Sequence, residues 1–260
     1  MSSKRRGGRI AVGALAGLAA ICIGLGIWVV VDGTGSDAAG DYRGDVEFRA
    51  ASGVTAPEAA DLPEVDAGLL GGSHDIAELA DADWVAATAA ATGIPERALQ
   101  AYAGAALRAG DMWPACGLGW NTLAAIGEVE THHGTIQGGS IGDDGVADPA
   151  IIGIALDGSS TDAITDTDGG ELDGDAEWDR AIGPMQFIPE TWQALALDGN
   201  GDGVLDPQQI DDAALTAAAA LCGPGGDLTD PAVWIDAVAG YNSATSYNNR
   251  VAEAANAYAQ

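Results

Sequence analysis

Basic residues are nearly absent from the greater part of this sequence of 260 residues. Lys4, Arg5, Arg6 and Arg9 stand at its start, and from Asp32 onward six arginines face 39 acidic residues. A surface this acidic repels nucleic acid and anionic lipid head groups, which excludes both as expected ligands of the main domain. The acidity then either serves solubility alone or, in part, binds divalent cations.

Aromatic residues are also few, at 5% of the chain, but seven of them are tryptophans. A surface rich in tryptophan and poor in lysine suits flat polar ligands such as sugars, although a single tryptophan is more often buried in the core. A run of strands with alternating apolar and polar residues is absent as well. The sequence therefore predicts a mainly α domain.

One apolar run, residues 10–31, is long enough to cross a bilayer as a helix. The basic cluster before it predicts a cytoplasmic N-terminus and export of the rest of the chain. The run is long for a signal peptide, and no small-x-small cleavage site follows it closely, so an uncleaved anchor is favoured. We expect a single-pass protein of the cell membrane with an extracytoplasmic domain, or a secreted protein if the leader is cleaved.

Four regions follow along the chain. Residues 1–9 form a basic cytoplasmic tail, residues 10–31 the transmembrane signal anchor, and residues 32–63 a flexible linker rich in Gly, Ala and Asp. Residues 64–260 form the folded domain. Within it, residues 135–180 are rich in Gly and Asp without clear periodicity, which predicts a long irregular insertion.

Helical periodicity and helix-end signals recur through the rest of the domain. The predicted helices span residues 75–92, 95–108, 118–133, 189–196, 208–222 and 231–257. Gly110 and Gly134 stand where two of these helices are expected to end. The long final segment is predicted as helical throughout.

Three cysteines are present. Cys22 lies within the apolar run, where it serves as a small apolar residue. Cys116 and Cys222 are expected in an oxidising compartment, where two cysteines pair more often than not. A disulfide that closes so long a loop stabilises a domain by roughly 4–5 kcal/mol in the chain-entropy model. The alternative is a pair of buried free thiols.

Glu130 is the carboxylate best placed to act as a general acid. It follows Ile126 by one turn, at the edge of the apolar face, whereas Glu128 points toward solvent. It also stands in the last turn before Gly134, where the partial negative charge of the helix end disfavours an ionised carboxylate. Apolar neighbours act in the same direction, so the pKa is expected to be raised, as a general acid requires. The alternative is an ordinary surface Glu.

Three segments together are specific. They are Gly127–Thr131 (GEVET), Gly183–Pro189 (GPMQFIP) and Gly240–Asn242 (GYN). In this order they resemble the lysozyme-like lytic murein transglycosylases of the membrane-bound B type. The resemblance covers roughly residues 90–258, and it implies a lysozyme-like domain with a saccharide cleft, in which Glu130 is the sole catalytic acid/base.

The resemblance also implies the residues that contact substrate. In this family the Met-Gln-Phe segment lines the cleft, and it corresponds to Met185, Gln186 and Phe187. The Tyr-Asn pair lies close to the catalytic Glu and the sugar, and it corresponds to Tyr241 and Asn242. The expected partner is therefore the glycan strand of peptidoglycan, in addition to the membrane through the N-terminal helix; no protein partner is indicated.

No second carboxylate stands in a motif of comparable specificity, although glycosidases normally need two. A lytic transglycosylase needs one, because the muramyl C6 hydroxyl replaces water and closes a 1,6-anhydro ring. Cleavage of the MurNAc–GlcNAc β-1,4 bond in this way is the expected activity. Asp143, Asp144 or Asp179 as a second carboxylate would make the protein a lysozyme-type hydrolase, and a peptidoglycan-binding protein without activity is the third alternative.

The segment from Asp198 to Asp206 begins like an EF-hand calcium loop. The expected ligands have oxygen atoms at the loop positions that such sites use, and they are Asp198, Asn200, Asp202 and the carbonyl of Val204. Position 12 is Gln209 where an acid is expected, but the resembled family has longer loops, and Asp212 stands three residues later. The expectation is a structural Ca²⁺, with a solvated Asp/Gly turn as the alternative. No cofactor is expected for catalysis.

Glu128, His132 and His133 invite comparison with a zinc site, since the first two are one helical turn apart. No cysteine or further histidine completes a ligand set, so zinc is not expected. The acidic run at residues 166–175 lacks EF-hand order. It is expected to be a solvated loop, with a lid or a second cation site as the alternative.

Overall fold

The structure is a computed structural model that describes residues 55–62, 75–159 and 161–260. The basic tail, the predicted transmembrane anchor and most of the predicted linker lie outside the described residues. Within the described ranges, none of the helices combines the length and the apolar character that a membrane crossing requires.

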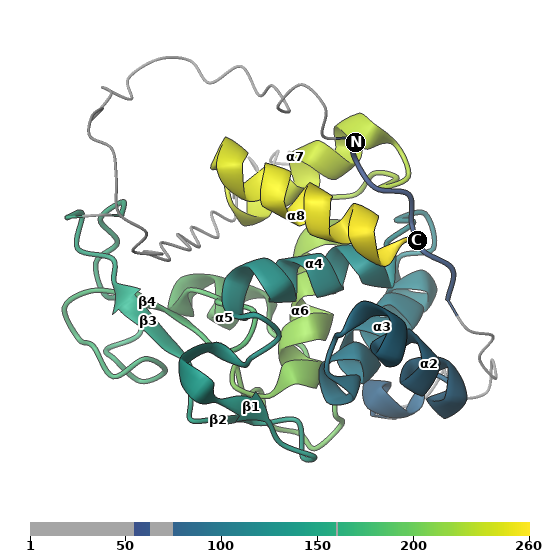
Figure 1. The fold of residues 1–260 in the computed structure, drawn as a ribbon. Helices are drawn as coiled ribbons and strands as arrows, with labels where there is room; N and C mark the ends of the chain where they lie inside the picture. Colours follow the sequence, from purple (N-terminus) through teal and green to yellow (C-terminus); the bar gives the residue numbers. More distant parts are fainter. Residues whose placement is uncertain (1–54, 63–74, 160) are drawn as a thin grey trace, which may run out of the picture.

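Seven α-helices and four short strands form the described domain (Figure 1). The helices are α2 (Ala82–Thr92), α3 (Glu96–Met112), α4 (Trp120–Thr131), α5 (Pro189–Leu195), α6 (Ile210–Cys222), α7 (Pro231–Tyr241) and α8 (Thr245–Tyr258). The 3-10 helices η1 (Ile76–Glu78) and η2 (Ile136–Gly138) accompany them. The expected mainly α fold is confirmed, and it is consistent with a lysozyme-like domain.

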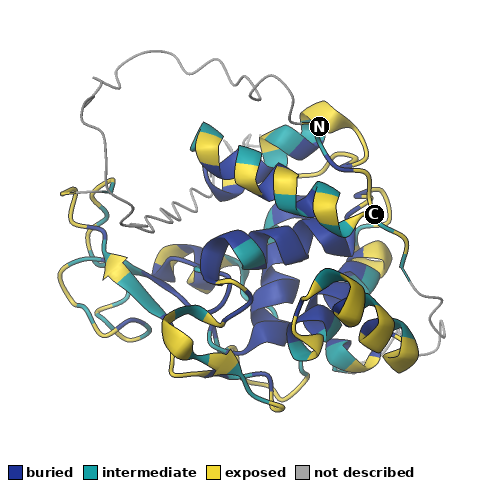
Figure 2. Ribbon diagram, viewed as in Figure 1, coloured by how far each residue is buried: buried dark blue, intermediate teal, exposed yellow. Residues whose placement is uncertain are grey.

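Helix α4 lies at the centre of the fold and packs against α3 and α8 (Figure 1). Every residue of α4 except Glu128 is buried, and Figure 2 shows this helix dark along almost its whole length. Leu123 and Ile126 are fully enclosed. A helix that is buried on almost all sides belongs in a core, so Glu130 at its C-terminal end stands on a well-packed element of the domain.

Helices α3 and α6 pack side by side and are joined by charge as well as by apolar contact. Arg97 of α3 forms a two-pronged ion pair with Asp211 of α6, whose side chain is fully buried. A disulfide between Cys116 and Cys222, with 5.5 Å between their Cα atoms, ties the segment before α4 to the end of α6. The predicted pairing of these cysteines is thus the one that the structure has.

Two helix ends differ from the expectation. Helix α3 continues through Gly110 to Met112, two residues beyond the glycine that was expected to end it. The helix expected over residues 231–257 is broken into α7 and α8 at residues 242–244. Asn242 accepts a hydrogen bond from the backbone N–H of Ala244 through its side chain, a local bond that competes with helix continuation.

The insertion over residues 135–180 is irregular, as expected, with two small antiparallel sheets. Strands β1 (Ser140–Ile141) and β2 (Ala147–Asp148) form one, and β3 (Ile152–Ala155) and β4 (Arg180–Ile182) form the other. The sheets lie beside the end of α4 that carries Glu130 (Figure 1). The insertion therefore forms one side of the candidate site.

Residues 55–62, at the end of the predicted linker, pass the start of α4 and the end of α8 (Figure 1). The side chain of Asn121, which is fully buried, bonds the carbonyl of Glu58 at 2.9 Å and the N–H of Ala60 at 3.1 Å. It also bonds the carbonyl of Ala255 on α8 at 3.1 Å. Contacts with the domain thus begin before the boundary expected at residue 64.

Candidate active site at the end of helix α4

Glu130 stands in the last turn of α4, one residue before the helix ends at Thr131. Only 5% of this residue is exposed. Its Oε1 accepts a 2.7 Å hydrogen bond from the hydroxyl of Tyr247 on α8, which is itself buried. The carboxyl is therefore enclosed by protein and held in one orientation by a neighbouring helix.

Burial raises the pKa of Glu130 to about 7, because the ionised form loses its hydration. The Tyr247 hydrogen bond and the positive charge of Arg250 lower the pKa in part, since both favour the ionised form. The net result is a carboxyl that both holds and releases a proton near neutral pH. That is the property that a single residue acting first as acid and then as base requires.

Backbone contacts bring the three specific sequence segments together around this carboxyl. Thr131 donates its hydroxyl to the carbonyl of Pro184 at 2.6 Å, and Tyr241 donates its hydroxyl to the carbonyl of Met185 at 2.8 Å. The segment 183–187 is thus fixed to α4 on one side and to α7 on the other. Together with the bond between Tyr247 and Glu130, these contacts join parts of the chain that are far apart in sequence.

The turn at residues 183–187 has two positions with positive φ. Gly183 has φ +75°, and a side chain there would collide with the carbonyl of Pro207. Gln186 has φ +52°, which is rare for a residue with a side chain and often marks a functional site. Its Nε2 donates to the carbonyl of Gly183 at 2.9 Å, and the residue is half-buried.

The other expected members of the Met-Gln-Phe segment lie in the core. Met185 and Phe187 are fully buried, and the Phe187 ring contacts the rings of Trp192 and Tyr241. Of these three neighbours in sequence, Gln186 reaches the surface. Contact of Met185 and Phe187 with a sugar stays a prediction, while their packing explains how the turn that presents Gln186 is held.

Asn242 and Asn248 lie next to the residues that hold this site, and both are almost fully buried. Asn248 donates to the carbonyl of Asn242 at 2.9 Å, which joins the start of α8 to the end of α7. Nδ2 of Asn242 and Oδ1 of Asn248 have no hydrogen-bond partner among the described residues. Asn242 was expected at the site from the sequence, whereas Asn248 was not.

The chain turns sharply after Glu130 through His132 and His133, which both have positive φ. Glu128 contacts His132 Nδ1 at 3.0 Å and His133 Nε2 at 3.2 Å. His133 is buried, and it also contacts the hydroxyls of Tyr102 at 3.3 Å and Tyr258 at 3.1 Å. Burial lowers the pKa of His133 to about 4. This network accounts for both histidines as supports of the turn.

The loop that starts at Asp198 folds as a closed turn that ends at Asp212. Asp198 accepts the N–H groups of Gly201 and Gly203, and Asp212 accepts those of Gly199 and Asp206. Asp212 is buried, and burial raises the pKa of its carboxyl to about 6, with the nearby charge of Asp198 acting in the same direction. Asp212 thus closes the loop from the first turn of α6 through hydrogen bonds, and its role as a calcium ligand stays a prediction.

The remaining expected ligands of that loop lie at its surface. Asn200 is half-buried and donates through Nδ2 to Asp202 at 3.1 Å, while Asp202 and Val204 are exposed. The loop ends beneath the turn at residues 183–187, where the carbonyl of Pro207 lies against Gly183.

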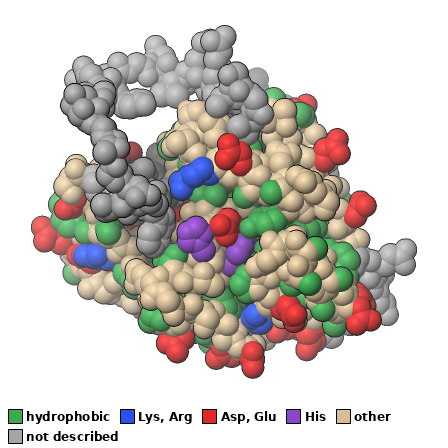
Figure 3. Space-filling model, in the orientation of Figure 1, with side chains coloured by type: hydrophobic (Ala, Val, Ile, Leu, Met, Phe, Trp, Pro, Cys, Tyr) green, Lys and Arg blue, Asp and Glu red, His purple; other side chains and the backbone are tan. Residues whose placement is uncertain are grey.

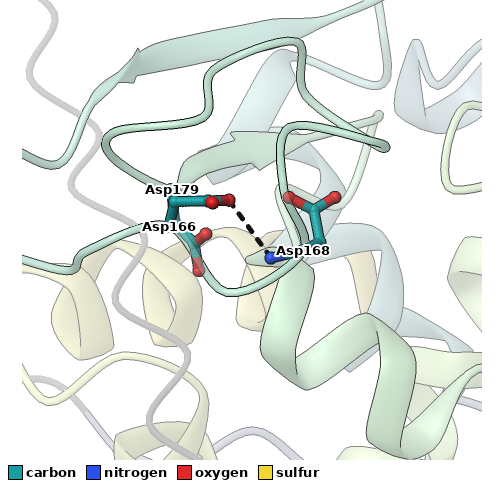
Figure 4. A group of neighbouring side chains, drawn as sticks. All are labelled: Asp166, Asp168 and Asp179. Carbon is teal, nitrogen blue, oxygen red and sulfur yellow. Dashed lines mark hydrogen bonds between the residues drawn. The ribbon is translucent and has the colours of Figure 1, made fainter.

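The structure brings a second acidic group together in the insertion. Among the described residues, Asp166, Asp168 and Asp179 are the acids whose oxygen atoms lie mutually within 4.8 Å (Figure 4). Backbone and hydroxyl groups of the same loop satisfy them: Asp179 accepts both the N–H and the hydroxyl of Thr167 at 2.8 Å, and Asp166 accepts the N–H of Gly169 at 2.8 Å. These hydrogen bonds hold the loop in its conformation, which accounts for the clustering of the three acids.

Sequence reasoning did not identify Tyr247 or Arg250, the two residues that act on the Glu130 carboxyl. Both lie on α8, and neither stands in one of the three specific segments. The sequence shows that they are three residues apart on one helix, but it does not predict which residues of other helices they approach. Only the packing of α8 against α4 brings them to the end of the latter helix.

Comparison with known proteins gives one match. Residues 164–226 match the family model described as "Transglycosylase SLT domain". No curated protein and no solved structure matches the chain significantly. The matched part contains the turn at residues 183–187 and the loop at 198–212, and it does not include Glu130 or Tyr247. The match supports a relation to peptidoglycan-acting enzymes of the lytic transglycosylase kind, within the lysozyme-like superfamily.

Proposed function

We propose that the protein is a peptidoglycan lytic transglycosylase that cleaves the MurNAc–GlcNAc β-1,4 bond with Glu130 as its acid and base. The observation that carries the proposal is the enclosed carboxyl of Glu130, with a pKa of about 7 and a hydrogen bond from Tyr247. The family match over residues 164–226 supports the class of substrate.

The proposed reaction uses the same carboxyl twice. Protonated Glu130 gives its proton to the glycosidic oxygen as the bond to the muramyl C1 breaks, and the substrate's acetamido group stabilises the positive charge that develops at C1. The carboxylate of Glu130, supported by the Tyr247 hydroxyl, then takes the proton of the muramyl C6 hydroxyl. The C6 oxygen bonds to C1 and closes the 1,6-anhydro ring, so Glu130 is protonated again.

A hydrolase of the lysozyme type would need a second carboxylate near the bond to be cleaved. Of the three acids considered from the sequence, Asp179 is buried and bonded to Thr167. Asp143 and Asp144 lie in the turn next to Arg97, at the side of the domain formed by β1 and β2. Among the described residues, the groups that shift the pKa of Glu130 are a tyrosine and an arginine and include no carboxylate. This favours the single-acid reaction.

The mass of the released muropeptides tests the proposal. Wild-type protein incubated with purified peptidoglycan should release products with 1,6-anhydromuramyl ends, whereas products with reducing ends would identify a hydrolase. Glu130→Gln should release none while it still folds. Glu128→Gln is the matched control, because it changes the same functional group two residues away on the same helix and should retain activity. A folded wild type that releases nothing would favour the third alternative, a peptidoglycan-binding protein.

We also propose that the loop at residues 198–212 binds a structural Ca²⁺. Asp198 and Asp212 approach closely enough for the charge of one to raise the pKa of the other, and neither has an ion pair with a basic residue among the described residues. Oxygen ligands of this kind suit Ca²⁺. Asp198, Asn200, Asp202, Asp212 and the carbonyl of Val204 would hold the ion, which takes no part in the reaction.

The location that fits this activity is the outer side of the cell membrane, and we propose that residues 10–31 anchor the protein there. The proposal rests on the sequence, since this segment lies outside the described residues. The full chain should fractionate with membranes and be degraded by protease added from the outside. A chain that is found in the medium without residues 1–31 would show instead that the leader is cleaved.

A further inference from the structure

Arg250 is an exposed residue on α8, one helical turn after the tyrosine that bonds the candidate catalytic carboxyl. It follows Tyr247 by three residues, so both project from the same side of the helix. Since the Tyr247 hydroxyl bonds Glu130, this spacing places the guanidinium at the surface next to the buried carboxyl. The positive charge of Arg250 is felt there, because it lowers the pKa of Glu130.

Among the residues that the structure describes, none is a partner of this guanidinium. Arg97 forms an ion pair with Asp211, and Arg180 forms one with Asp175, whereas Arg250 has neither a hydrogen bond nor an ion pair among the described residues. Acidic residues are abundant in this chain, and Glu253 stands only three residues further along α8. An arginine that stays unpaired in such surroundings keeps all its donors for a ligand.

The surface around Arg250 is suited to a ligand that carries both sugar and charge. The exposed side chain of His132 and the carboxylate of Glu128 form the neighbouring end of α4, and they are bonded to each other at 3.0 Å. Figure 3 shows basic, acidic and histidine side chains close together on the face formed by α4 and α8, while acidic side chains line much of the rim. The acidic rim repels an anionic polymer, so a positively charged side chain near the site is needed to hold the polymer in place.

We propose that Arg250 binds a carboxylate on the muramyl side of the substrate, next to the bond that Glu130 cleaves. This inference rests on the proposed function and adds a specificity to it. A guanidinium binds a carboxylate through two parallel hydrogen bonds, which gives orientation as well as affinity. The carboxylate belongs either to the stem peptide or to the lactyl group that is left when the peptide is removed. Polymers of N-acetylglucosamine alone have neither, so Arg250 would separate peptidoglycan from chitin-like glycans.

Binding to three soluble glycans of equal length tests the inference. They are strands with stem peptides, strands from which an amidase has removed the peptides, and chitooligosaccharides. The full chain with Glu130→Gln binds without turnover, and it is compared with the double variant that also has Arg250→Gln. The double variant should bind at least one of the two muramyl ligands about tenfold more weakly, as expected for loss of a charged hydrogen bond. Affinity for the chitooligosaccharide should stay within about twofold.

The muramyl ligand that loses affinity identifies which carboxylate is bound. Arg250→Lys should retain part of the affinity, because it keeps the charge and loses the second hydrogen bond. Arg108→Gln on α3 is the control for net charge and should leave all three affinities unchanged. Equal losses for the muramyl ligands and the chitooligosaccharide, or no loss with Arg250→Gln, would overturn the inference.

The two proposals fail in different ways. Should wild-type protein cleave peptidoglycan while Arg250→Gln leaves binding and cleavage of muramyl ligands unaffected, only the role of Arg250 is wrong. A Glu130→Gln protein that binds none of the three glycans contradicts both proposals together. Rates of cleavage are compared at pH values below the Glu130 pKa of about 7, so that the effect of Arg250 on that pKa does not enter the comparison.

Discussion

The hydroxyl of Tyr247 on α8 donates a 2.7 Å hydrogen bond to Oε1 of Glu130 on α4. This bond favours the ionised carboxylate, and it opposes the burial that raises the pKa of the same group. Without the tyrosine, a carboxyl so enclosed would hold its proton too firmly to give it up and take it back near neutral pH. The pair therefore sets the working pH range of the proposed reaction.

Tyr247→Phe should move the upper limb of the pH–rate profile to higher pH. Removal of the donor raises the pKa of Glu130 above about 7, so the protonated acid persists to a higher pH. The rate should fall by about tenfold or more, because the carboxylate formed after proton transfer loses a hydrogen bond. Tyr258→Phe is the control, since this tyrosine contacts His133 instead. A profile of Tyr247→Phe that coincides with wild type would contradict the role of the bond.

Glu130→Gln should stabilise the fold at neutral and alkaline pH. The pKa of this carboxyl is raised from 4.5 to about 7 by folding, so its contribution to stability is largest below pH 4.5 and is lost as the pH rises to about 7. Above that range the buried charge costs up to about 3 kcal/mol, which glutamine does not incur. Thermal unfolding at pH 8 and at pH 4 measures the effect.

The gain in melting temperature of Glu130→Gln over wild type should be clear at pH 8 and small at pH 4. Glu128→Gln changes a half-buried carboxylate on the same helix and should show no such gain. If Glu130→Gln gave the same change at both pH values, the raised pKa would be wrong.

Calcium should raise the melting temperature of the protein. An ion that binds only the folded state stabilises it by about 3 kcal/mol at a hundredfold excess over the dissociation constant, which corresponds to roughly 5–10 °C for a domain of this size. Asp202→Ala should abolish the rise, because it removes a ligand from the exposed part of the loop. Asp236→Ala, on the surface of α7, should keep it. An unchanged melting temperature of wild type in calcium would contradict the site.

Asn121→Ala should lower the free energy of unfolding by about 2–4 kcal/mol. The buried amide joins the segment 55–62 to α4 and α8 through the backbone of Glu58, Ala60 and Ala255, so its loss removes three hydrogen bonds that hold the segment in place. Chemical denaturation measures the change. Asn256→Ala is the matched control, because its side chain bonds Thr55 at the exposed end of that segment. It should cost less than about 1 kcal/mol. Equal effects of the two variants would show that the segment is not clamped by Asn121.

The amino-acid sequence alone determined the helical class, the place of Glu130 in the last turn of a helix and the pairing of the cysteines. Periodic apolar residues placed α4 and α6 within two residues of their observed limits. Glu130 could be singled out because both its neighbours and its place before Gly134 are local features. The position of Asp212 at the end of the loop that starts at Asp198 also followed from spacing within one stretch of chain, while its role as a calcium ligand stays a prediction.

Only the tertiary structure decided what surrounds that acid. Tyr247 and Arg250 are more than a hundred residues away from Glu130 in sequence, and they approach it because α8 packs antiparallel to α4, with Asn121 and Ala255 joined at the opposite ends. Contacts with α5 and α7 hold Met185 and Phe187, which the sequence had suggested for the cleft, in the core, and Gln186 is left half-buried. Local patterns report periodicity and turn preferences, whereas the partner of a side chain depends on how distant helices bury their apolar faces together.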